Sequence, residues 1–490
     1  MLLSNLILVL SIIFLPASGS LFKEGSTCIV TPISASPQAL VRRSIDTVPS
    51  TGRDVDPDQS TGLWDVIDPY KSPAPGTPGA LTHFPHPEPG RAHFHARRGL
   101  SPFEREVEPL TTRQTPAPVD DTPQILEAFK QCGQDGTIIF REGTYHIRQV
   151  MDTTDLRNCS IEIHGTWVWS ADNIPYWRQR SFSVTYANRQ TAWRLGGRDV
   201  SLRGFGKALF DGNGQVWIDL ARGQANMDGR PISLTIWKGT NVLIDGIRWQ
   251  MAQFWHTFVA HSQNVTMTNL EMHTYSKSSQ SSVNTDGTNT WNSRDIYIAN
   301  WTVTSGDDCI AVKGNSTNVH VRNVTCYESG AMVIGSIGSN SWQPDYVENV
   351  VFEDIKLNHS SNAAWIKTYP GTGYVRNVTF RNIEFSDVNQ PIYVTACIYS
   401  YRGCDNSRIP ITDIRWENIT GTSRYNVAAA MRCSSQAPCD RFSFSNINIR
   451  PKNGETAKVL CTNIRNQATM GLTCTGSMPE SHPQQLNGNV

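Results

Sequence analysis

Three aspartates have a spacing that could support acid–base chemistry. Asp307 and Asp308 are adjacent in TSGDDCIAVK, and Asp286 lies 21 residues earlier in VNTDGTNTWN. Clustered carboxylates raise one another's pKa, so one of them can stay protonated beside ionised neighbours. A protonated and an ionised carboxyl side by side are what hydrolysis of a glycosidic bond requires. The alternative for such a cluster is a calcium site or a set of turn aspartates.

A repeated pattern along the chain must position these aspartates. Asn or Asp begins each repeat and two apolar residues at alternate positions follow, in NVLIDGIRWQ, NVTMTNLEMH, DIYIANWTVT, NVHVRNVTCY, NVVFEDIKLN, NVTFRNIEFS and DIRWENITGT. The starts differ by 23, 31, 23, 31, 28 and 36 residues, a loose period that indicates a solenoid. The apolar period of two excludes helical repeats, and propeller blades need roughly 40 or more residues. The pattern therefore predicts an all-β fold, a parallel β-helix.

Such a solenoid would stack Asp286 beside Asp307 and Asp308, because their separation is close to one short coil. Both adjacent aspartates can face the same side only if the backbone turns there, which Gly306 permits. The repeated asparagines suit turns between the sheets, where Asn tolerates left-handed backbone and its side chains can form a ladder. DDTPQILEAFKQC predicts a short amphipathic helix that caps the open N-terminal end.

The chain before this helix is divided by composition. Residues 1–20 have the apolar run and small residues of a secretory signal peptide, and residues 21–118 include thirteen prolines between Pro49 and Pro118. This second segment is expected to be disordered, either as a pro-segment processed at Arg42-Arg43 or Arg97-Arg98 or as an uncleaved linker. A metal role for His83, His86, His93 and His95 is disfavoured. The catalytic domain is expected over 119–476, with a polar tail over 477–490.

The cysteines and glycosylation sequons favour a secreted, extracellular protein. Eleven cysteines are present, and their order suggests the disulfides Cys132–Cys159, Cys309–Cys326, Cys397–Cys404, Cys433–Cys439 and Cys461–Cys474, with Cys28 as the odd thiol. The N-x-S/T sequons begin at Asn158, Asn264, Asn300, Asn315, Asn323, Asn358, Asn377 and Asn418. No metal or other cofactor is expected. The balance of 43 basic and 43 acidic residues gives no reason to expect a nucleic-acid or membrane partner.

Three motifs resemble glycoside hydrolase family 28, the family that contains polygalacturonases. They are NTDG at 284–287, GDDC at 306–309 and IKT at 366–368, and the similarity runs from about Asp120 to Cys474. The resemblance implies a right-handed β-helix and an inverting mechanism, with Asp307 as general acid and Asp286 and Asp308 activating water. The Cys309–Cys326 pair also matches the family.

Two departures from the family pattern concern the sugar that is recognised. Gly330 stands where polygalacturonases have a histidine, and Trp365 stands where they have an arginine before Ile-Lys. An indole cannot replace a bidentate clamp on a carboxylate, but it offers a face to an apolar sugar surface. A neutral sugar is therefore expected, and the pattern resembles fungal α-L-rhamnosidases or exo-rhamnogalacturonases. Substrate contacts are expected from Lys367, Trp365, Asn284 and His256, although His256 could equally be structural; Trp255 beside it is an equal candidate.

The predicted function is removal of terminal α-L-rhamnose from pectic or other rhamnosides by a secreted monomer. The alternatives are an exo-polygalacturonase and a non-catalytic carbohydrate-binding β-helix. The intact aspartate triplet disfavours the second alternative.

Overall fold

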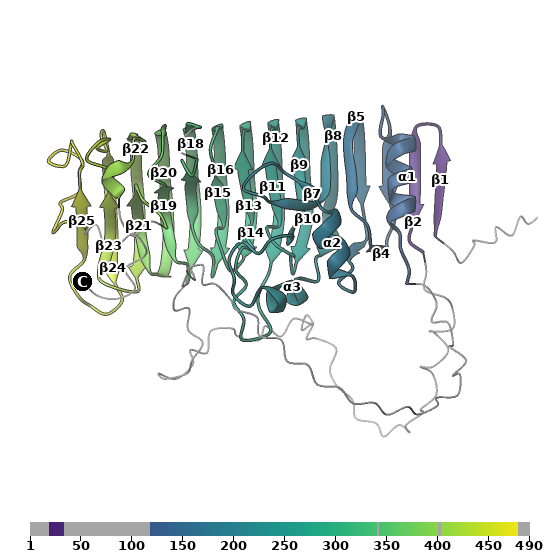
Figure 1. The fold of residues 1–490 in the computed structure, drawn as a ribbon, viewed down its shortest axis with the longest axis horizontal. Helices are drawn as coiled ribbons and strands as arrows, with labels where there is room; N and C mark the ends of the chain where they lie inside the picture. Colours follow the sequence, from purple (N-terminus) through teal and green to yellow (C-terminus); the bar gives the residue numbers. More distant parts are fainter. Residues whose placement is uncertain (1–18, 34–117, 341–342, 400–402, 479–490) are drawn as a thin grey trace, which may run out of the picture. The chain divides into compact units, whose positions relative to one another are not determined.

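The computed structural model describes residues 19–33, 118–340, 343–399 and 403–478, which form a right-handed parallel β-helix (Figure 1). Each regular coil contributes one long and one short strand, and each strand pairs in parallel with its counterpart in the next coil. Among the described strands, only the β1–β2 and β7–β8 pairs are antiparallel. The predicted fold class is confirmed.

The elements fall into three groups. The N-terminal part contains β1 (Ser20–Glu24), β2 (Thr27–Thr31), α1 (Thr122–Cys132), β3 (Thr137–Phe140), β4 (Thr144–Ile147), β5 (Met151–Ile163), β6 (Thr166–Trp169), α2 (Ile174–Arg180), β7 (Phe182–Ser183) and α3 (Gly214–Ala221). The long strands are β8 (Gln190–Asp211), β10 (Thr240–Gln250), β12 (Gln263–His273), β14 (Arg294–Thr304), β16 (Ser316–Tyr327), β18 (Asp345–Asn358), β20 (Gly373–Val388), β22 (Ile411–Ser423) and β24 (Ser443–Pro451). The short strands are β9 (Pro231–Trp237), β11 (Thr257–Ala260), β13 (Thr288–Trp291), β15 (Ile310–Val312), β17 (Met332–Ile337), β19 (Asn362–Thr368), β21 (Gln390–Thr395), β23 (Val427–Arg432) and β25 (Lys458–Thr462).

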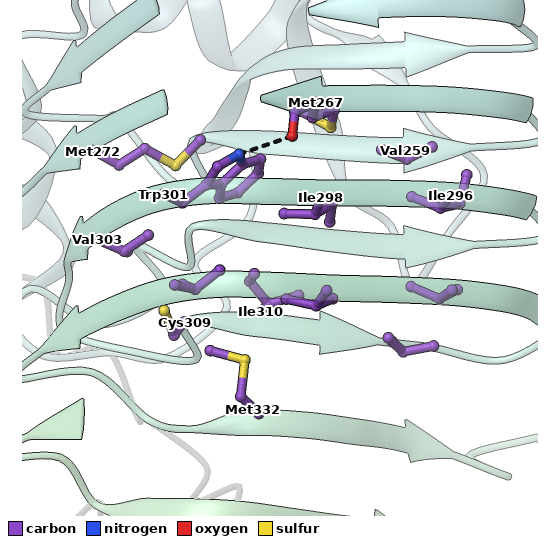
Figure 2. Close-up of a cluster of buried hydrophobic side chains, with 14 of the residues drawn as sticks. Val259, Met267, Met272, Ile296, Ile298, Trp301, Val303, Cys309, Ile310 and Met332 are labelled. Atoms are coloured by element: carbon purple, nitrogen blue, oxygen red, sulfur yellow. Dashed lines mark hydrogen bonds between the residues drawn. The ribbon is translucent and has the colours of Figure 1, made fainter. Parts of the chain in front are cut away.

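The inward side chains of successive coils stack into columns that form the core. Ile298 of β14 pairs in register with Met267 of β12 and Val321 of β16, and the alternation along β14 brings Ile296, Ile298 and Trp301 inward (Figure 2). The Trp301 indole donates to the Met267 carbonyl at 3.0 Å. The period-two pattern in the repeats is therefore the pattern of the core, because alternate residues of a strand face opposite sides.

The repeated asparagines lie in left-handed turns and form ladders between coils. Asn323 Nδ2 donates to Asn300 Oδ1 at 2.8 Å, and Asn300 Nδ2 donates to Asn269 Oδ1 at 3.0 Å. All three have positive φ, between 51° and 60°. The ladder prediction is confirmed. Six sequon asparagines use Nδ2, the atom that would carry a glycan, in side-chain contacts between coils: Asn158, Asn264, Asn300, Asn323, Asn377 and Asn418. Their glycosylation remains a prediction.

The N-terminal end carries the predicted helix and also a hairpin that the sequence did not predict. Helix α1 is present, but β1 and β2 form a hairpin whose second strand pairs with β3, so residues 20–31 are part of the folded unit. Cys28 is bonded to Cys132, and Cys159 is a buried free thiol. The predicted Cys132–Cys159 bond and the predicted odd thiol at Cys28 are therefore wrong. The reason is that β2 pairs with β3 of the first coil, which places Cys28 beside α1.

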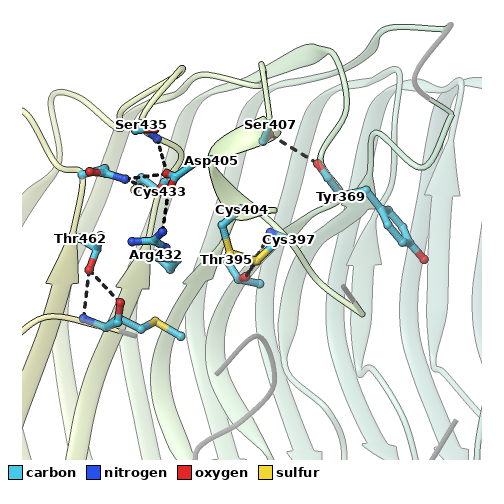
Figure 3. The surroundings of a disulfide bond; sticks show 12 residues. Tyr369, Thr395, Cys397, Cys404, Asp405, Ser407, Arg432, Cys433, Ser435 and Thr462 are labelled. Carbon is cyan, nitrogen blue, oxygen red and sulfur yellow. Dashed lines mark hydrogen bonds and ion pairs between the residues drawn. A yellow bond between two sulfur atoms is a disulfide. The ribbon is translucent and has the colours of Figure 1, made fainter. Parts of the chain in front are cut away.

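The other four disulfides join the predicted pairs within or between neighbouring coils. Figure 3 shows Cys397–Cys404, which fixes the segment after β21. Asp405 follows in a short 3-10 turn, Cys404–Asn406. Its carboxylate accepts from Arg432 Nη2 at 2.9 Å and from the Ser435 amide at 2.7 Å. This segment lies beside the end of β19, which carries Lys367 and is followed by Tyr369, because the Ile398 amide donates to the Thr368 carbonyl at 2.8 Å.

Several sequence predictions lie outside the described residues. They concern the signal peptide up to residue 18, most of the 21–118 segment with its dibasic pairs and four histidines, and the tail from residue 479. No described helix has the length and apolar character needed to cross a membrane.

Candidate active site

The turns that precede successive short strands bring the three aspartates together. Asp286 lies two residues before β13, and Asp307 and Asp308 lie three and two residues before β15 on the next coil. The Gly287 amide donates to the Asp308 carbonyl at 3.1 Å, which fixes the two turns in register. One carboxylate oxygen from each aspartate lies within 4.8 Å of the others. The stacking predicted from the 21-residue separation is therefore the stacking in the structure.

Asp307 is the most accessible of the three carboxylates and is held by amide donors. Its Oδ2 accepts from the Asn284 backbone amide at 3.0 Å and from Asn284 Nδ2 at 3.1 Å, while its Oδ1 accepts from the Asp308 amide at 2.8 Å. Burial and the charge of Asp308 raise its pKa, against the opposing charge of Lys367. Asn284, expected as a substrate contact, thus holds the Asp307 carboxylate in place.

Asp308 forms a buried ion pair with Lys367. Lys367 Nζ lies 2.8 Å from Asp308 Oδ2, and each side chain is 4% exposed. Burial alone would lower the pKa of Lys367, but the charge of Asp308, with smaller contributions from Tyr399 and Asp307, raises it overall. Lys367 was expected to contact substrate; the structure instead gives it a carboxylate partner in the site itself.

Asp286 is almost fully buried, at 3% exposed. Its Oδ2 accepts from Asn289 Nδ2 at 3.0 Å. Burial, followed by the charges of Asp307 and Asp308, raises its pKa well above the ordinary range. Among the described residues, Asp286 Oδ1 and Asp308 Oδ1 are buried oxygens without a hydrogen-bond partner. Buried acceptors of this kind point to a polar group from solvent or ligand, which suits two carboxylates that act on water.

His256 lies beneath the site and does not face open space. It is fully buried; its Nδ1 contacts the Asp286 carbonyl and its Nε2 contacts Thr274 Oγ1, both at 2.9 Å. Burial lowers its pKa to about 4. Of its two expected roles, the geometry supports the structural one. Trp255 next to it is 4% exposed and packs against Tyr186 and Phe258.

At the two positions that depart from the family pattern, a buried indole fills position 365 and close packing leaves no room for a side chain at position 330. Trp365 is 8% exposed, stacks on Tyr393 with centroids 5.5 Å apart, and has Lys367 Nζ 4.0 Å from its ring centroid. Gly330 packs against Asp308 so closely that an added Cβ would lie 2.6 Å from Oδ1 and 2.8 Å from Cα of Asp308. Position 330 therefore cannot hold a side chain unless the Asp308 turn moves.

Lys313 is a charged residue of the site that sequence reasoning missed. It is the last residue of TSGDDCIAVK and is 7% exposed. Its Nζ donates to the Gly335 carbonyl at 3.3 Å and lies 5.3 Å from the Trp255 ring centroid. Alternation could have found it, because Lys313 falls where an outward-facing residue of β15 would lie, on the same coil as Asp308.

Aromatic residues frame the site on both sides along the solenoid. Tyr186, from the segment between β7 and β8, lies 5.3 Å from Trp291 and 5.9 Å from Phe258, measured between ring centroids. On the other side Tyr369 follows β19 and lies 5.9 Å from Tyr399. Burial raises the pKa of Tyr186, and Tyr369 adds to this effect. The short-strand face is therefore covered close to the aspartates.

The aspartate triplet also has the composition of a cation site, since three carboxylate oxygens lie within 4.8 Å. Lys367 already pairs with Asp308, however, and Lys313 acts electrostatically on Asp286. Two ammonium groups in the same cluster oppose the binding of a divalent cation. The donor set fits proton transfer better than metal ligation.

Comparison with known proteins decides the family. The model of glycosyl hydrolases family 28 matches residues 170–470, a range that includes all three aspartates and Lys367. The chain belongs to glycosyl hydrolases family 28.

Its relatives within family 28 differ in their named activities. An "Alpha-L-rhamnosidase rgxB" of Aspergillus niger is 32% identical over 403 residues, which cover 78% of this chain and 92% of the relative. A "Putative galacturan 1,4-alpha-galacturonidase A" of Aspergillus niger is 34% identical over 401 residues, 72% of this chain and 90% of the relative. The solved endo-xylogalacturonan hydrolase from Aspergillus tubingensis superposes with a TM-score of 0.66 at 31% identity, covering 73% of this chain and 96% of that chain. Family 28 membership makes this chain a glycoside hydrolase without naming its sugar.

Proposed function

We propose that this family 28 enzyme is a secreted, inverting hydrolase that removes terminal α-L-rhamnose from pectic or related rhamnosides. The observation that carries the proposal is the state of positions 330 and 365. Gly330 has no room for a side chain, and Trp365 is a buried indole. Neither position presents a charged donor to a sugar carboxylate, so a neutral sugar fits this part of the site better than a uronate.

In the proposed mechanism Asp307 is the general acid because it is the most accessible carboxyl of the trio. It gives its proton to the glycosidic oxygen as the bond to the anomeric carbon breaks. Asp286 and Asp308 take a proton from the water that attacks this carbon. Their unpartnered oxygens, Asp286 Oδ1 and Asp308 Oδ1, are the atoms we assign to that water.

Action at a chain end is supported by the aromatic residues around the site. Tyr186 packs onto Phe258 and Trp291, on the coils that precede and contain Asp286. A long polysaccharide lying along the short strands would have to pass this contact. We therefore assign an exo mode, in which the terminal sugar enters next to Asp307.

The sugar preference is tested by comparing three substrates with the unmodified enzyme. We expect kcat/KM for an aryl α-L-rhamnoside to exceed that for an aryl galacturonide by at least about 100-fold, because a uronate here would lack its charge-paired donors. Polygalacturonate should release no galacturonate above background. A preference for polygalacturonate would overturn the rhamnose assignment.

The opposite preference would support an exo-polygalacturonase, the second candidate. A galacturonidase name among the relatives at 34% identity and a buried ammonium at Lys313 are the observations that favour it. In that case Lys313 or Arg189 would have to hold the uronate, since positions 330 and 365 do not.

Stereochemistry tests the inverting mechanism independently of the sugar. The 4.8 Å limit applies to one oxygen of each carboxylate and is not the separation of the carboxyl groups, which is roughly 6.5–9.5 Å in most inverting enzymes. The proposal rests instead on the family resemblance and on the two base carboxylates. Proton NMR of the first product from an α-L-rhamnoside is expected to show the β-anomer. Initial release of the α-anomer would mean a covalent intermediate and retention.

A further inference from the structure

Lys313 is a buried ammonium to which no carboxylate of the described residues is hydrogen-bonded. Its contacts among the described residues are the Gly335 carbonyl at 3.3 Å and the rings of Trp255 and Tyr186, whose centroids lie 5.3 Å and 5.8 Å away. A charged lysine at 7% exposure is costly unless a nearby negative charge offsets the loss of water. Burial lowers the pKa of Lys313, and Asp286 is the largest influence in the opposite direction.

The charges of the site can be paired one by one. Three carboxylates face two ammonium groups, and Lys367 is already bonded to Asp308 at 2.8 Å. Lys313 is the remaining ammonium group, and its backbone amide donates at 2.9 Å to the carbonyl of Thr290 in β13, the strand that follows Asp286. The Asp286 side chain otherwise has one amide donor, Asn289. The buried Arg230 guanidinium, which acts on Asp307 and Asp286, lies outside the count of these three carboxylates and two ammonium groups. Their charges cancel when the remaining carboxyl, Asp307, keeps its proton. That is the charge state that a general acid beside two bases requires.

We propose that Lys313 is a positioning residue: its ammonium is the counter-charge of Asp286, as that of Lys367 is for Asp308, so that the proton of the trio stays on Asp307. The inference rests on the acid and base roles in the proposed function. It does not depend on which sugar is cleaved.

Other charged groups also face Asp286, and Lys313 is the cation with the largest influence on it. Arg230 is tied to the carbonyls of Gln253 and Val283, and the Arg189 guanidinium lies over the Phe254 ring at 5.7 Å. His256 touches the Asp286 carbonyl rather than its carboxyl. Among the described residues, the groups that face Asp286 are Asp307, Asp308 and Lys313 from the β15 coil, Asn289 from β13, His256 from before β11, Arg230 from before β9 and Arg189 from before β8.

The test is the pH profile of kcat/KM for Lys313→Met. Without the ammonium, Asp286 should hold its proton to higher pH. The decline of kcat/KM on the acid side of the profile should therefore lie about one pH unit higher than in the unmodified enzyme. At pH values below this decline, the variant should lose about tenfold more kcat/KM than it loses on the plateau. Lys313→Arg keeps the positive charge, so the acid-side decline of its kcat/KM should stay at the pH of the unmodified enzyme. Lys238→Met is the matched control, because Lys238 is an exposed lysine 5.7 Å from the Trp237 ring, outside the trio.

Two further measurements make the outcome decisive. In an Asp286→Asn background, adding Lys313→Met should change the residual activity by less than about twofold, because the partner charge is gone; Lys313→Gln replaces Met if the Met variant does not fold. If Lys313→Met loses the same factor in kcat/KM at every pH and the acid-side decline does not move, Lys313 has only a structural role.

The assays use whichever aryl glycoside the unmodified enzyme cleaves faster, so failure of the rhamnose assignment leaves this test intact. Failure of the acid and base roles would appear separately, as an active Asp307→Asn variant.

Discussion

Asp307→Asn is expected to lower kcat on a natural rhamnoside by at least about two orders of magnitude, the scale of losing a general acid. An aryl rhamnoside with a good leaving group should lose much less, because its oxygen needs little protonation. Folding should be retained, since Asp307 is the partly exposed member of the trio. Steady-state kinetics on both substrates, with a thermal unfolding midpoint for each variant, measures this.

The matched comparison is Asp286→Asn, because the electrostatics alone do not favour Asp307 as the acid. Asp307 accepts three amide hydrogen bonds, which favour its ionised form, whereas Asp286 accepts one and is almost fully buried. Accessibility to the leaving oxygen is the argument for Asp307. The general acid is the residue whose replacement lowers kcat more on the natural rhamnoside than on the aryl rhamnoside. If Asp286→Asn shows this difference and Asp307→Asn does not, the acid and base assignments must be exchanged.

Lys367→Met is expected to destabilise the protein by about 3–5 kcal/mol at pH 7 and to abolish most activity, because it leaves Asp308 buried without its counter-charge. The raised pKa of Lys367 fixes the sign of the pH dependence. The stabilisation is fully present below the ordinary lysine pKa and is lost only as the pH rises through the higher folded value. Urea unfolding should therefore show a constant contribution through neutral pH.

Lys356→Met is the control for this loss of an ion pair. Lys356 lies 3.9 Å from Glu384, but the two side chains are 66% and 70% exposed, so less than about 1 kcal/mol is expected. Asp308→Asn combined with Lys367→Met should be less destabilising than Lys367→Met alone, because no unpaired charge remains. Equal losses in Lys356→Met and Lys367→Met would contradict the buried pair.

The fold was predictable from the sequence because every coil repeats the same short-range pattern of residues. Apolar residues alternate along each strand, and each coil returns an asparagine such as Asn300 to the same left-handed turn. The coil length then placed Asp286 over the Asp307–Asp308 pair. These contacts join residues roughly one coil apart, which is why spacing along the chain could reveal them.

Features that depend on three-dimensional closeness escaped the sequence. Pairing cysteines by order failed where Cys28 crosses 104 residues to reach Cys132. The sequence left His256 equally open to a substrate contact and to a structural role, and only the structure shows that both ring nitrogens are used inside the turn. The closeness of Gly330 to Asp308 depends on how tightly two turns pack, which residue types alone do not specify.

The N-terminal cap has a consequence for the order in which the molecule assembles. Within the described coils, each strand pairs with the next coil along the chain, so the stack can grow coil by coil as the chain emerges. The β1–β2 hairpin is made first but pairs with β3 only after more than a hundred further residues have followed. The hairpin therefore has to wait unpaired until the first coil is made, and it can then cover the edge of β3 while the later coils are still being added. The molecule is thus sealed at its beginning by a contact between segments far apart in the chain, and the Cys28–Cys132 bond makes that closure covalent.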